Sequence, residues 1–338
     1  MNLDLDKYKS FALVREMMET VEIVKKFNKN ITREIAKDIK NKNNILLTGE
    51  GSSRIFPAKN AIRRANIRGM NYNIFTEGSH QANQYNLSDT VMMCASNSGK
   101  TKELIVLINK LKNEGNINLY GVTANSGTLL DELCTNTVIL SCGKENAVAA
   151  TKSVVEQALV YEALLWNMDN SYTQPDLNQL ASAIEKTLTL VIPDSIIEAA
   201  LNAPTVYFAG YNDGIAEELT LKTNEIIRKK SDYLEGSYAV HGIEEVMDSR
   251  DIVFVIEPIE EEIDKFQHVL EKGVGLKIIA IATHETPFET IVVPDAGDYN
   301  SYVYLCAGWN CLVEIGLAAG VDLDKPQRAR KVGNEFIM

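Results

Sequence analysis

Residues 90–101 read TVMMCASNSGKT, and they join an apolar run to a turn rich in hydroxyl groups. The run 90–95 predicts a strand, and the amphipathic stretch 101–112 predicts a helix directly after it. Hydroxyl groups, a glycine and a helix N-terminus at the carboxyl end of a strand are what a phosphate group needs for binding. The alternative is an ordinary helix cap on a flexible turn, because serine and threonine are also preferred at helix starts.

The same alternation of strand and helix extends outward from this stretch. Apolar runs at 45–48, 72–75, 118–123 and 137–140 predict four further strands, and 53–67 predicts a helix. The first 40 residues predict two helices, the second beginning near Thr32. Strands that alternate with helices in this way indicate a parallel sheet covered by helices on both faces.

The pattern then restarts in the second half of the chain. Runs at 205–210, 251–256 and 280–283 repeat those at 45–49, 89–94 and 120–123 with an offset of about 160 residues, which indicates two copies of one α/β unit. The polar stretch 167–177 is the expected linker. We therefore expect N-terminal helices over 1–41, a first unit over 42–170, a second unit over 171–320 and a C-terminal tail over 321–338.

Composition narrows the class of protein. The 338 residues hold 34 Lys and Arg against 46 Asp and Glu, and a net charge of -12 disfavours binding to nucleic acid or an anionic membrane. The 5 cysteines include no C-x-x-C pair, which argues against a disulfide framework or a zinc site. No run is apolar enough for a membrane span, and the start MNLDLDKYKS lacks the core of a signal peptide. We expect a cytoplasmic protein without metal or cofactor.

Two further groups of residues are candidates for a site. The loop GEGSS at 49–53 ends the first strand, and two glycine- and serine-containing loops on one sheet edge are typical of the ligand crevice of open α/β sheets. Glu218, Lys222, Glu225 and Lys229 are spaced 4, 3 and 4 residues apart, on one face of a predicted helix. Taken alone, they favour a solvated stripe of salt bridges, and His241 favours an ordinary hydrogen-bonded structural role.

Together with AVAATK at 147–152, these loops and the doubled architecture resemble the tandem SIS (sugar isomerase) domain family. The resemblance runs from about Lys42 onward and is strongest to the isomerase half of glucosamine-6-phosphate synthase and to phosphosugar deaminases and deglycases. It implies two tandem flavodoxin-like units with the C-terminal tail over the site. The second half reads EPIE at 257–260 where the phosphate loop would stand, which implies one phosphate site per chain. The implied phosphate ligands are Ser53, Ser96, Asn97, Ser98 and Thr101, and the implied further substrate contacts are Gly51, Ser52, Ala149, Ala150 and Lys222.

The resemblance also assigns catalytic roles. In the family, E-x-x-x-K-x-x-E on a helix is followed by an H-G pair, which implies Glu225 as the base that moves a proton between C1 and C2 of an open-chain sugar. It implies that His241 opens the sugar ring from the neighbouring subunit, and hence a homodimer. The tail DLDKP at 322–326 resembles the family ending, and Lys331 would then hold the reacting carbonyl or stabilise an enediolate.

Departures from the family pattern leave the C2 substituent of the sugar open. The H-G pair lacks the usual following proline, and Ala150 stands where a substrate-contacting serine is common. Because the chain begins without a glutaminase domain, synthesis from glutamine is not expected of it. The leading interpretation is a deaminase and isomerase of the glucosamine-6-phosphate type. The alternatives are a deglycase of fructosamine or fructosyl-amino-acid 6-phosphate, a plain aldose–ketose isomerase, and a non-catalytic sugar-phosphate-binding regulator.

Overall fold

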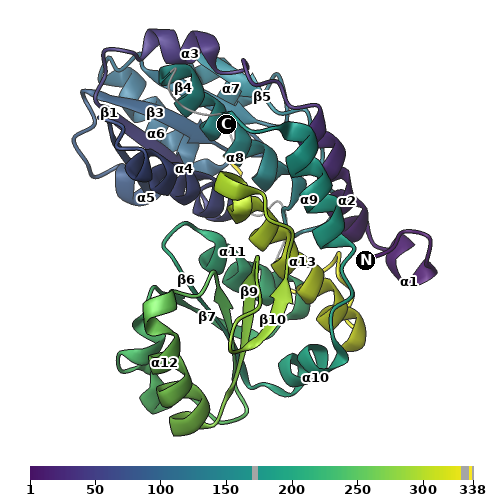
Figure 1. Cartoon of the computed structure of the whole chain (residues 1–338). Helices are drawn as coiled ribbons and strands as arrows, with labels where there is room; N and C mark the ends of the chain where they lie inside the picture. The colour runs from purple at the N-terminus through teal and green to yellow at the C-terminus, as the bar shows by residue number, and fades with distance from the viewer. Residues whose placement is uncertain (170–173, 329–334, 337–338) are drawn as a thin grey trace. The chain divides into compact units, whose positions relative to one another are not determined.

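The computed structural model describes residues 1–169, 174–328 and 335–336 (Figure 1). The chain divides into two compact units, each built around one sheet. We call Glu22–Glu145, Ala150–Leu177 and Val332–Met338 the first-sheet unit, and Met1–Val21, Asn146–Ala149 and Asn178–Lys331 the second-sheet unit. The domain boundaries expected at residues 41, 170 and 320 remain predictions.

The first sheet has five parallel strands in the order β2-β1-β3-β4-β5. Gly49 and Ala95 face each other at the ends of β1 and β3, so the loops after these two strands leave the sheet at one edge. The strands are β1 (Asn44–Gly49), β2 (Asn73–Gly78), β3 (Thr90–Ala95), β4 (Leu119–Thr123) and β5 (Asn136–Ile139). The helices around it are α3 (Arg33–Asp38), α4 (Ile55–Ile67), α5 (Ser79–Ala82), α6 (Lys102–Asn113), α7 (Leu129–Leu133) and α8 (Lys152–Met168), with the short 3-10 turn η1 (Gly51–Ser53).

The second sheet repeats this topology, with the order β10-β9-β8-β6-β7 and all neighbours parallel. Its strands are β6 (Thr205–Gly210), β7 (Lys230–Glu235), β8 (Ile252–Ile256), β9 (Lys277–Ala282) and β10 (Glu289–Val292). Its α-helices are α10 (Asp194–Asn202), α11 (Ile215–Lys222), α12 (Ile263–Phe266) and α13 (Asn300–Ala318), and α1 (Asp6–Lys9) belongs to the same unit. Two helices, α2 (Ala12–Lys25) and α9 (Leu177–Leu188), each contribute residues to both units.

The expected fold class is confirmed: each unit has a parallel sheet with helices around it (Figure 1). The strands expected in the first half and those at 205–210, 251–256 and 280–283 correspond to β1 to β6, β8 and β9. The sequence did not predict β7 and β10, which are the two edges of the second sheet. No described helix combines the length and the apolar character that crossing a membrane requires.

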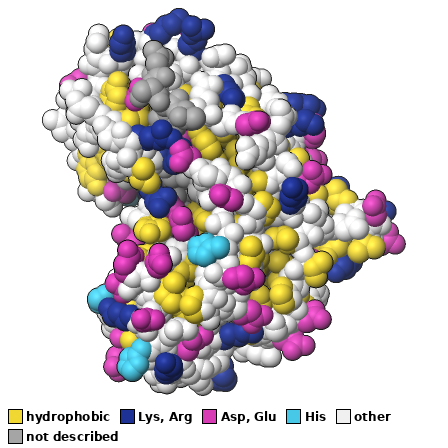
Figure 2. Space-filling view, viewed as in Figure 1, with side chains coloured by type: hydrophobic (Ala, Val, Ile, Leu, Met, Phe, Trp, Pro, Cys, Tyr) yellow, Lys and Arg dark blue, Asp and Glu magenta, His cyan; other side chains and the backbone are white. Residues whose placement is uncertain are grey.

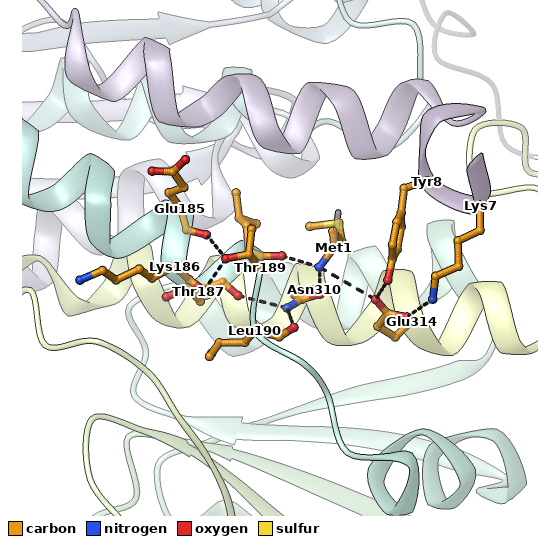
Figure 3. Close-up of polar contacts among 11 residues, drawn as sticks. Met1, Lys7, Tyr8, Glu185, Lys186, Thr187, Thr189, Leu190, Asn310 and Glu314 are labelled. Atoms are coloured by element: carbon orange, nitrogen blue, oxygen red, sulfur yellow. Dashed lines mark hydrogen bonds and ion pairs between the residues drawn. The ribbon is translucent and has the colours of Figure 1, made fainter. Parts of the chain in front are cut away.

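Helix α13 holds the start of the chain and the end of α9 inside the second-sheet unit (Figure 3). The Asn310 side-chain amide donates to the carbonyls of Thr187, at 3.1 Å, and Leu190, at 2.8 Å. One turn further along, Glu314 accepts a hydrogen bond of 2.5 Å from the Tyr8 hydroxyl. Since Asn310 is fully buried, these bonds satisfy a polar group that would otherwise destabilise the core.

Candidate functional site

The turn 96–101 after β3 gathers its hydroxyl groups at the start of α6. The Ser96 Oγ lies 2.8 Å from Thr101 Oγ1 and 3.4 Å from Ser98 Oγ. The Gly99 N–H donates to Ser96 Oγ at 3.0 Å, and Thr101 is the N-cap residue of α6. The structure therefore brings three of the predicted phosphate ligands together at a helix N-terminus, where backbone N–H groups favour an anion.

Glycine is required at position 99 of this turn. Its φ of +66° lies in the left-handed region, and an added Cβ would lie 2.2 Å from the Thr128 Oγ1. The turn therefore packs directly against the segment that begins α7, and only glycine fits both the conformation and the space.

A buried carboxylate, Glu145, positions the amide of Asn97. Glu145 is 2% exposed; its Oε2 accepts hydrogen bonds from Asn97 Nδ2, at 2.9 Å, and from Ser153 Oγ, at 2.6 Å. Its Oε1 accepts the N–H of Thr151 at 2.7 Å, at the start of α8. Glu145 thus ties the fourth predicted ligand to a second helix N-terminus. Sequence analysis missed it, because no spacing pattern links residue 145 to residue 97.

The loop after β1 lies beside the turn 96–101, the candidate phosphate site. Gly51, Ser52 and Ser53 form η1, and Gly51 has a φ of +53°. A Cβ at Gly49 would lie 2.7 Å from the Ala95 carbonyl oxygen, so only glycine allows these two strand ends to approach so closely. The Ser53 carbonyl accepts a hydrogen bond from the Gln157 side chain of α8. The two predicted loops therefore share one edge of the first sheet.

The other predicted substrate contacts, Ala149 and Ala150, lie just before α8. Ala149 is buried and is part of the second-sheet unit, whereas Ala150 is half-buried and is part of the first-sheet unit. Their role in substrate binding stays a prediction.

The described end of the C-terminal tail contacts the phosphate-loop candidate. Glu335 forms an antiparallel bridge with Thr101, and the Phe336 N–H donates to the Lys100 carbonyl at 2.9 Å. The Phe336 ring packs on the first-sheet core beside α6. Lys331, the catalytic candidate of the tail, lies outside the described residues.

Glu218 and Lys222 of α11 and Glu225, three residues further on, form an ion triad, and the interpretation as a solvated stripe is wrong for Glu218 and Lys222. Glu218 and Lys222 are fully buried. The Lys222 Nζ lies 3.2 Å from Glu218 Oε1 and 2.9 Å from Glu225 Oε2. Glu225 is 22% exposed at its side chain and is thus the member of the triad that is open to solvent.

Helix packing explains this burial. A Cβ at Gly308 of α13 would lie 2.3 Å from the Leu219 Cδ2, so the absent side chain lets α11 approach α13 closely. The helix then widens into the π-helical turn η2 (Thr223–Ile227), and Arg228 ends it with a φ of +59°. Lys229 consequently lies beyond the helix and donates to the Leu201 carbonyl at 2.7 Å. The expected common face holds for the first three residues and fails for Lys229.

The triad keeps Lys222 charged. Burial by itself lowers the pKa of a lysine, but the carboxylates of Glu218 and Glu225 outweigh this effect and raise the pKa of Lys222 above its ordinary value. A permanently protonated Lys222 holds Glu225 in place through a charge-assisted hydrogen bond.

His241 is exposed and lies at the end of the 3-10 turn η3 (Tyr238–Val240). Its Nε2 lies 3.1 Å from the Lys265 Nζ. An ammonium group can only donate, so a hydrogen bond between these two atoms has the imidazole Nε2 as its acceptor. The structure places His241 and Glu225 in the same unit of the chain.

The equivalent edge of the second sheet has a different chemistry. Glu257 follows β8 with a φ of +48°, and Pro258 comes next. The cavity at this edge has a volume of about 10 Å³, close to one water molecule, and Glu257 and Phe288 are among its lining residues. Carboxylates and apolar groups therefore stand where the first sheet has hydroxyl groups.

Comparison with known proteins identifies the first-sheet region. The family model described as "SIS domain" matches residues 38–166, which include both loops and most of α8. The curated relative glutamine–fructose-6-phosphate aminotransferase (isomerizing) of Streptococcus agalactiae is 22% identical, over 95% of this chain and 58% of its own length. The chain thus spans less than two thirds of that relative. The match covers residues 38–166, which is less than half of the chain, and a second SIS unit stays a prediction.

Solved structures share the fold over nearly the whole chain. The C-terminal domain of glucosamine-fructose-6-phosphate aminotransferase from Francisella tularensis has a TM-score of 0.75 at 17% identity and covers 93% of this chain and 98% of that one. Tagatose-6-phosphate ketose/aldose isomerase from Escherichia coli scores 0.73 at 16%, covering 94% and 95%. Glucosamine-6-phosphate deaminase from Thermotoga maritima scores 0.72 at 15%, covering 94% and 98%. At these identities the likeness concerns the fold.

Proposed function

We propose that this protein is an enzyme that isomerises and deaminates an aminated sugar 6-phosphate of the glucosamine-6-phosphate type. The observation that carries the proposal is Glu225, a partly exposed carboxylate fixed 2.9 Å from the buried Lys222 ammonium. A general base must be held at one position to move a proton efficiently, and this ion pair provides that restraint.

The phosphate group would bind at the turn 96–101. The hydroxyls of Ser96, Ser98 and Thr101 already lie within one cluster, and the start of α6 supplies N–H groups. Hydroxyl and backbone donors suit a strongly acidic chain, because they bind an anion without a large positive surface.

The chemistry assigned to Glu225 is a proton transfer between neighbouring carbons. Removing the C2 proton of the open-chain amino aldose, returning a proton to C1 and transferring one amine proton to O1 gives a 2-imino ketose. Water then adds to the imine carbon, and ammonia leaves, so that amino-sugar phosphate and water become ketose phosphate and ammonia. His241 is assigned to ring opening, where a group that exchanges protons near neutral pH is required. In keeping with the family, we assign this histidine to the site of the neighbouring subunit in a homodimer.

The comparisons support this class of substrate. The solved structures of similar fold include a deaminase and an isomerase whose names state 6-phosphorylated sugars as substrates. The matching SIS domain contains the proposed phosphate turn.

The proposal is tested with a panel of three substrates. The full chain is incubated separately with glucosamine-6-phosphate, fructosyl-lysine 6-phosphate and fructose-6-phosphate, while ammonia, free amine and hexose phosphates are followed. We expect equal amounts of ammonia and fructose-6-phosphate from the first substrate. Release of lysine from the second alone would make the protein a deglycase, and turnover of the third alone would make it a plain isomerase. Binding of all three without turnover would make it a regulator and overturn the enzymatic proposal.

A further inference from the structure

A cavity of about 390 Å³ lies in the second-sheet unit, beyond the end of the π-helical turn η2. Two separate segments line it: one runs from Asn224 through Arg228 to Lys230 at the start of β7, and the other is 326–328 of the tail. Small-molecule sites in proteins typically have volumes of roughly 300–1,000 Å³, so the cavity is large enough for a metabolite-sized ligand.

The lining is strongly basic. Arg228, Lys229 and Lys230 follow one another along the chain, and Arg328 is contributed by the tail. The described lining residues include no carboxylate, although the whole chain has a net charge of -12. On the face shown in Figure 2, acidic and basic side chains are interspersed. Four cations around one cavity therefore form a local positive potential in an acidic protein, which attracts anions.

These cations are not neutralised within the described part of the chain. Lys230 and Arg328 are exposed and form no ion pair with a described residue. The Lys229 ammonium donates to a carbonyl, that of Leu201, rather than to a carboxylate. Asn224 and Gln327 add neutral amide groups that can donate further hydrogen bonds to an oxyanion.

Arg228 connects the cavity to the tail. Its Nη2 donates to the backbone carbonyls of Asp322 and, at 2.9 Å, of Lys325, while its Nε has no acceptor among the described residues. Asp324 between them accepts the N–H groups of Ala12 and Leu13, both at 2.8 Å. Arg228 and Asp324 therefore anchor the part of the tail that forms one wall of the cavity.

From this geometry we infer that the cavity is a binding site for a small, multiply charged oxyanion, separate from the turn 96–101. A guanidinium group and ammonium groups on several sides suit a phosphate or carboxylate cluster, because charge-assisted hydrogen bonds are strongest to such oxygens. The bound anion bridges segment 326–328 and residues 228–230, which follow the end of the π-helical turn that carries Glu225. It would hold segment 326–328 of the tail in addition to the hydrogen bonds that Arg228 makes to the carbonyls of Asp322 and Lys325.

The test is isothermal titration of the full chain with inorganic pyrophosphate and, separately, with citrate. A double variant, Lys230→Glu with Arg328→Glu, reverses two charges in the cavity. Its matched control, Lys186→Glu with Lys272→Glu, makes the same change in net charge at two exposed lysines of the same unit outside the cavity. Ser96→Ala separately weakens the candidate phosphate turn. Thermal melting checks that each variant is folded, and the milder Lys230→Gln serves if the double variant is not.

We expect the wild-type protein and the control to bind at least one of the two anions, and the cavity variant to bind it at least tenfold more weakly. Ser96→Ala should leave this binding event unchanged. Binding of pyrophosphate alone indicates a phosphorylated ligand, and equal binding of citrate indicates that carboxylates also serve. The inference is overturned if neither anion binds the wild-type protein, or if cavity variant and control bind within twofold of each other.

Discussion

The Lys222 Nζ lies 2.9 Å from the Glu225 Oε2. Of the two ion pairs described in the triad of Glu218, Lys222 and Glu225, this one joins a fully buried side chain to a partly exposed one. Lys222 is the last residue of α11, and Glu225 lies in the π-helical turn η2 that follows. The wider turn of the π-helix therefore helps to set the position of Glu225. Sequence spacing alone indicated a surface salt bridge, but in the structure the buried Lys222 holds the carboxylate of the candidate base Glu225 in position.

Replacing Lys222 with Met should destabilise the fold. The substitution keeps the side-chain length but leaves Glu218 buried without its cation, and breaking a buried ion pair from one side costs about 3–5 kcal/mol. Urea denaturation measures this loss. Adding Glu218→Gln to Lys222→Met should recover part of it, because the buried charge is then removed. A double variant less stable than Lys222→Met would contradict this account of the triad.

The pH dependence of this stabilisation follows from the direction of the pKa shift. The pKa of Lys222 is raised above 10.5, its ordinary value, in the folded protein. Its contribution is therefore complete below that value and is lost only as the pH rises through the folded pKa. The stability difference between the wild-type protein and the double variant of Lys222→Met with Glu218→Gln, which removes the fully buried carboxylate, should stay constant between about pH 7 and pH 9. A steep decline within that range would show that Lys222 loses its proton early.

Gly99→Ala should be more harmful than Gly127→Ala. Both glycines have a φ of +66°, but a Cβ at Gly127 meets nothing within 4 Å, whereas at Gly99 it lies 2.2 Å from the Thr128 Oγ1. The backbone conformation costs about 1–2 kcal/mol at either position, and the clash adds about 1–3 kcal/mol at Gly99. Denaturation curves give both values, and phosphate binding should weaken only in Gly99→Ala. Equal effects of the two substitutions would refute the packing argument.

Glu145→Gln should weaken phosphate binding without touching a predicted ligand. The amide group can no longer accept from Asn97, Ser153 and the start of α8 together, so the Asn97 side chain loses its support. Losing one such charged hydrogen bond costs about 1.5–3 kcal/mol, and we expect at least tenfold weaker binding of inorganic phosphate by titration. Glu132→Gln, at an exposed position of α7, is the control. Unchanged phosphate binding in Glu145→Gln would show that the Glu145 carboxylate does not position Asn97 for phosphate binding.

The assignment of His241 to the neighbouring subunit can be tested by complementation. Glu225→Gln and His241→Asn should each be nearly inactive. In an equal mixture of the two, half of the dimers are mixed, and each mixed dimer holds one intact site. Activity should therefore return to about a quarter of the wild-type level after subunit exchange. If His241 acts within its own chain, mixing restores nothing.

The sequence was sufficient for the fold because most strands are buried. Apolar runs such as 90–95 and 252–256 are buried throughout, and their composition alone marks them. The two strands that were missed, β7 and β10, are edge strands with alternating exposure, and KSDYLE in β7 has too few apolar residues to predict a strand. Burial on both faces made the central strands recognisable, whereas the edge strands β2 and β5 were predicted only from short apolar runs.

The candidate site was predictable only where its residues are close in the sequence. The turn 96–101 was found because its hydroxyl groups, its glycine and the helix start are contiguous. Glu145 could not be found, since its link to Asn97 exists only in the fold. Helical spacing correctly placed Glu218, Lys222 and Glu225 together, but spacing carries no information about burial, which depends on the close approach at Gly308. The early end of the helix at Arg228 was equally invisible.

The central claim, that Glu225 moves the C2 proton of an aminated sugar 6-phosphate, is tested most directly by one measurement. Glucosamine-6-phosphate is incubated in deuterium oxide with the wild-type protein, with Glu225→Gln and with the exposed control Glu245→Gln, and fructose-6-phosphate is followed by NMR. We expect the wild type and the control to form fructose-6-phosphate with deuterium at C1, and Glu225→Gln to be slower by about 10²–10⁴-fold, the usual contribution of a general base. Equal rates in the wild type and Glu225→Gln, or no product with any of the three, would contradict the account.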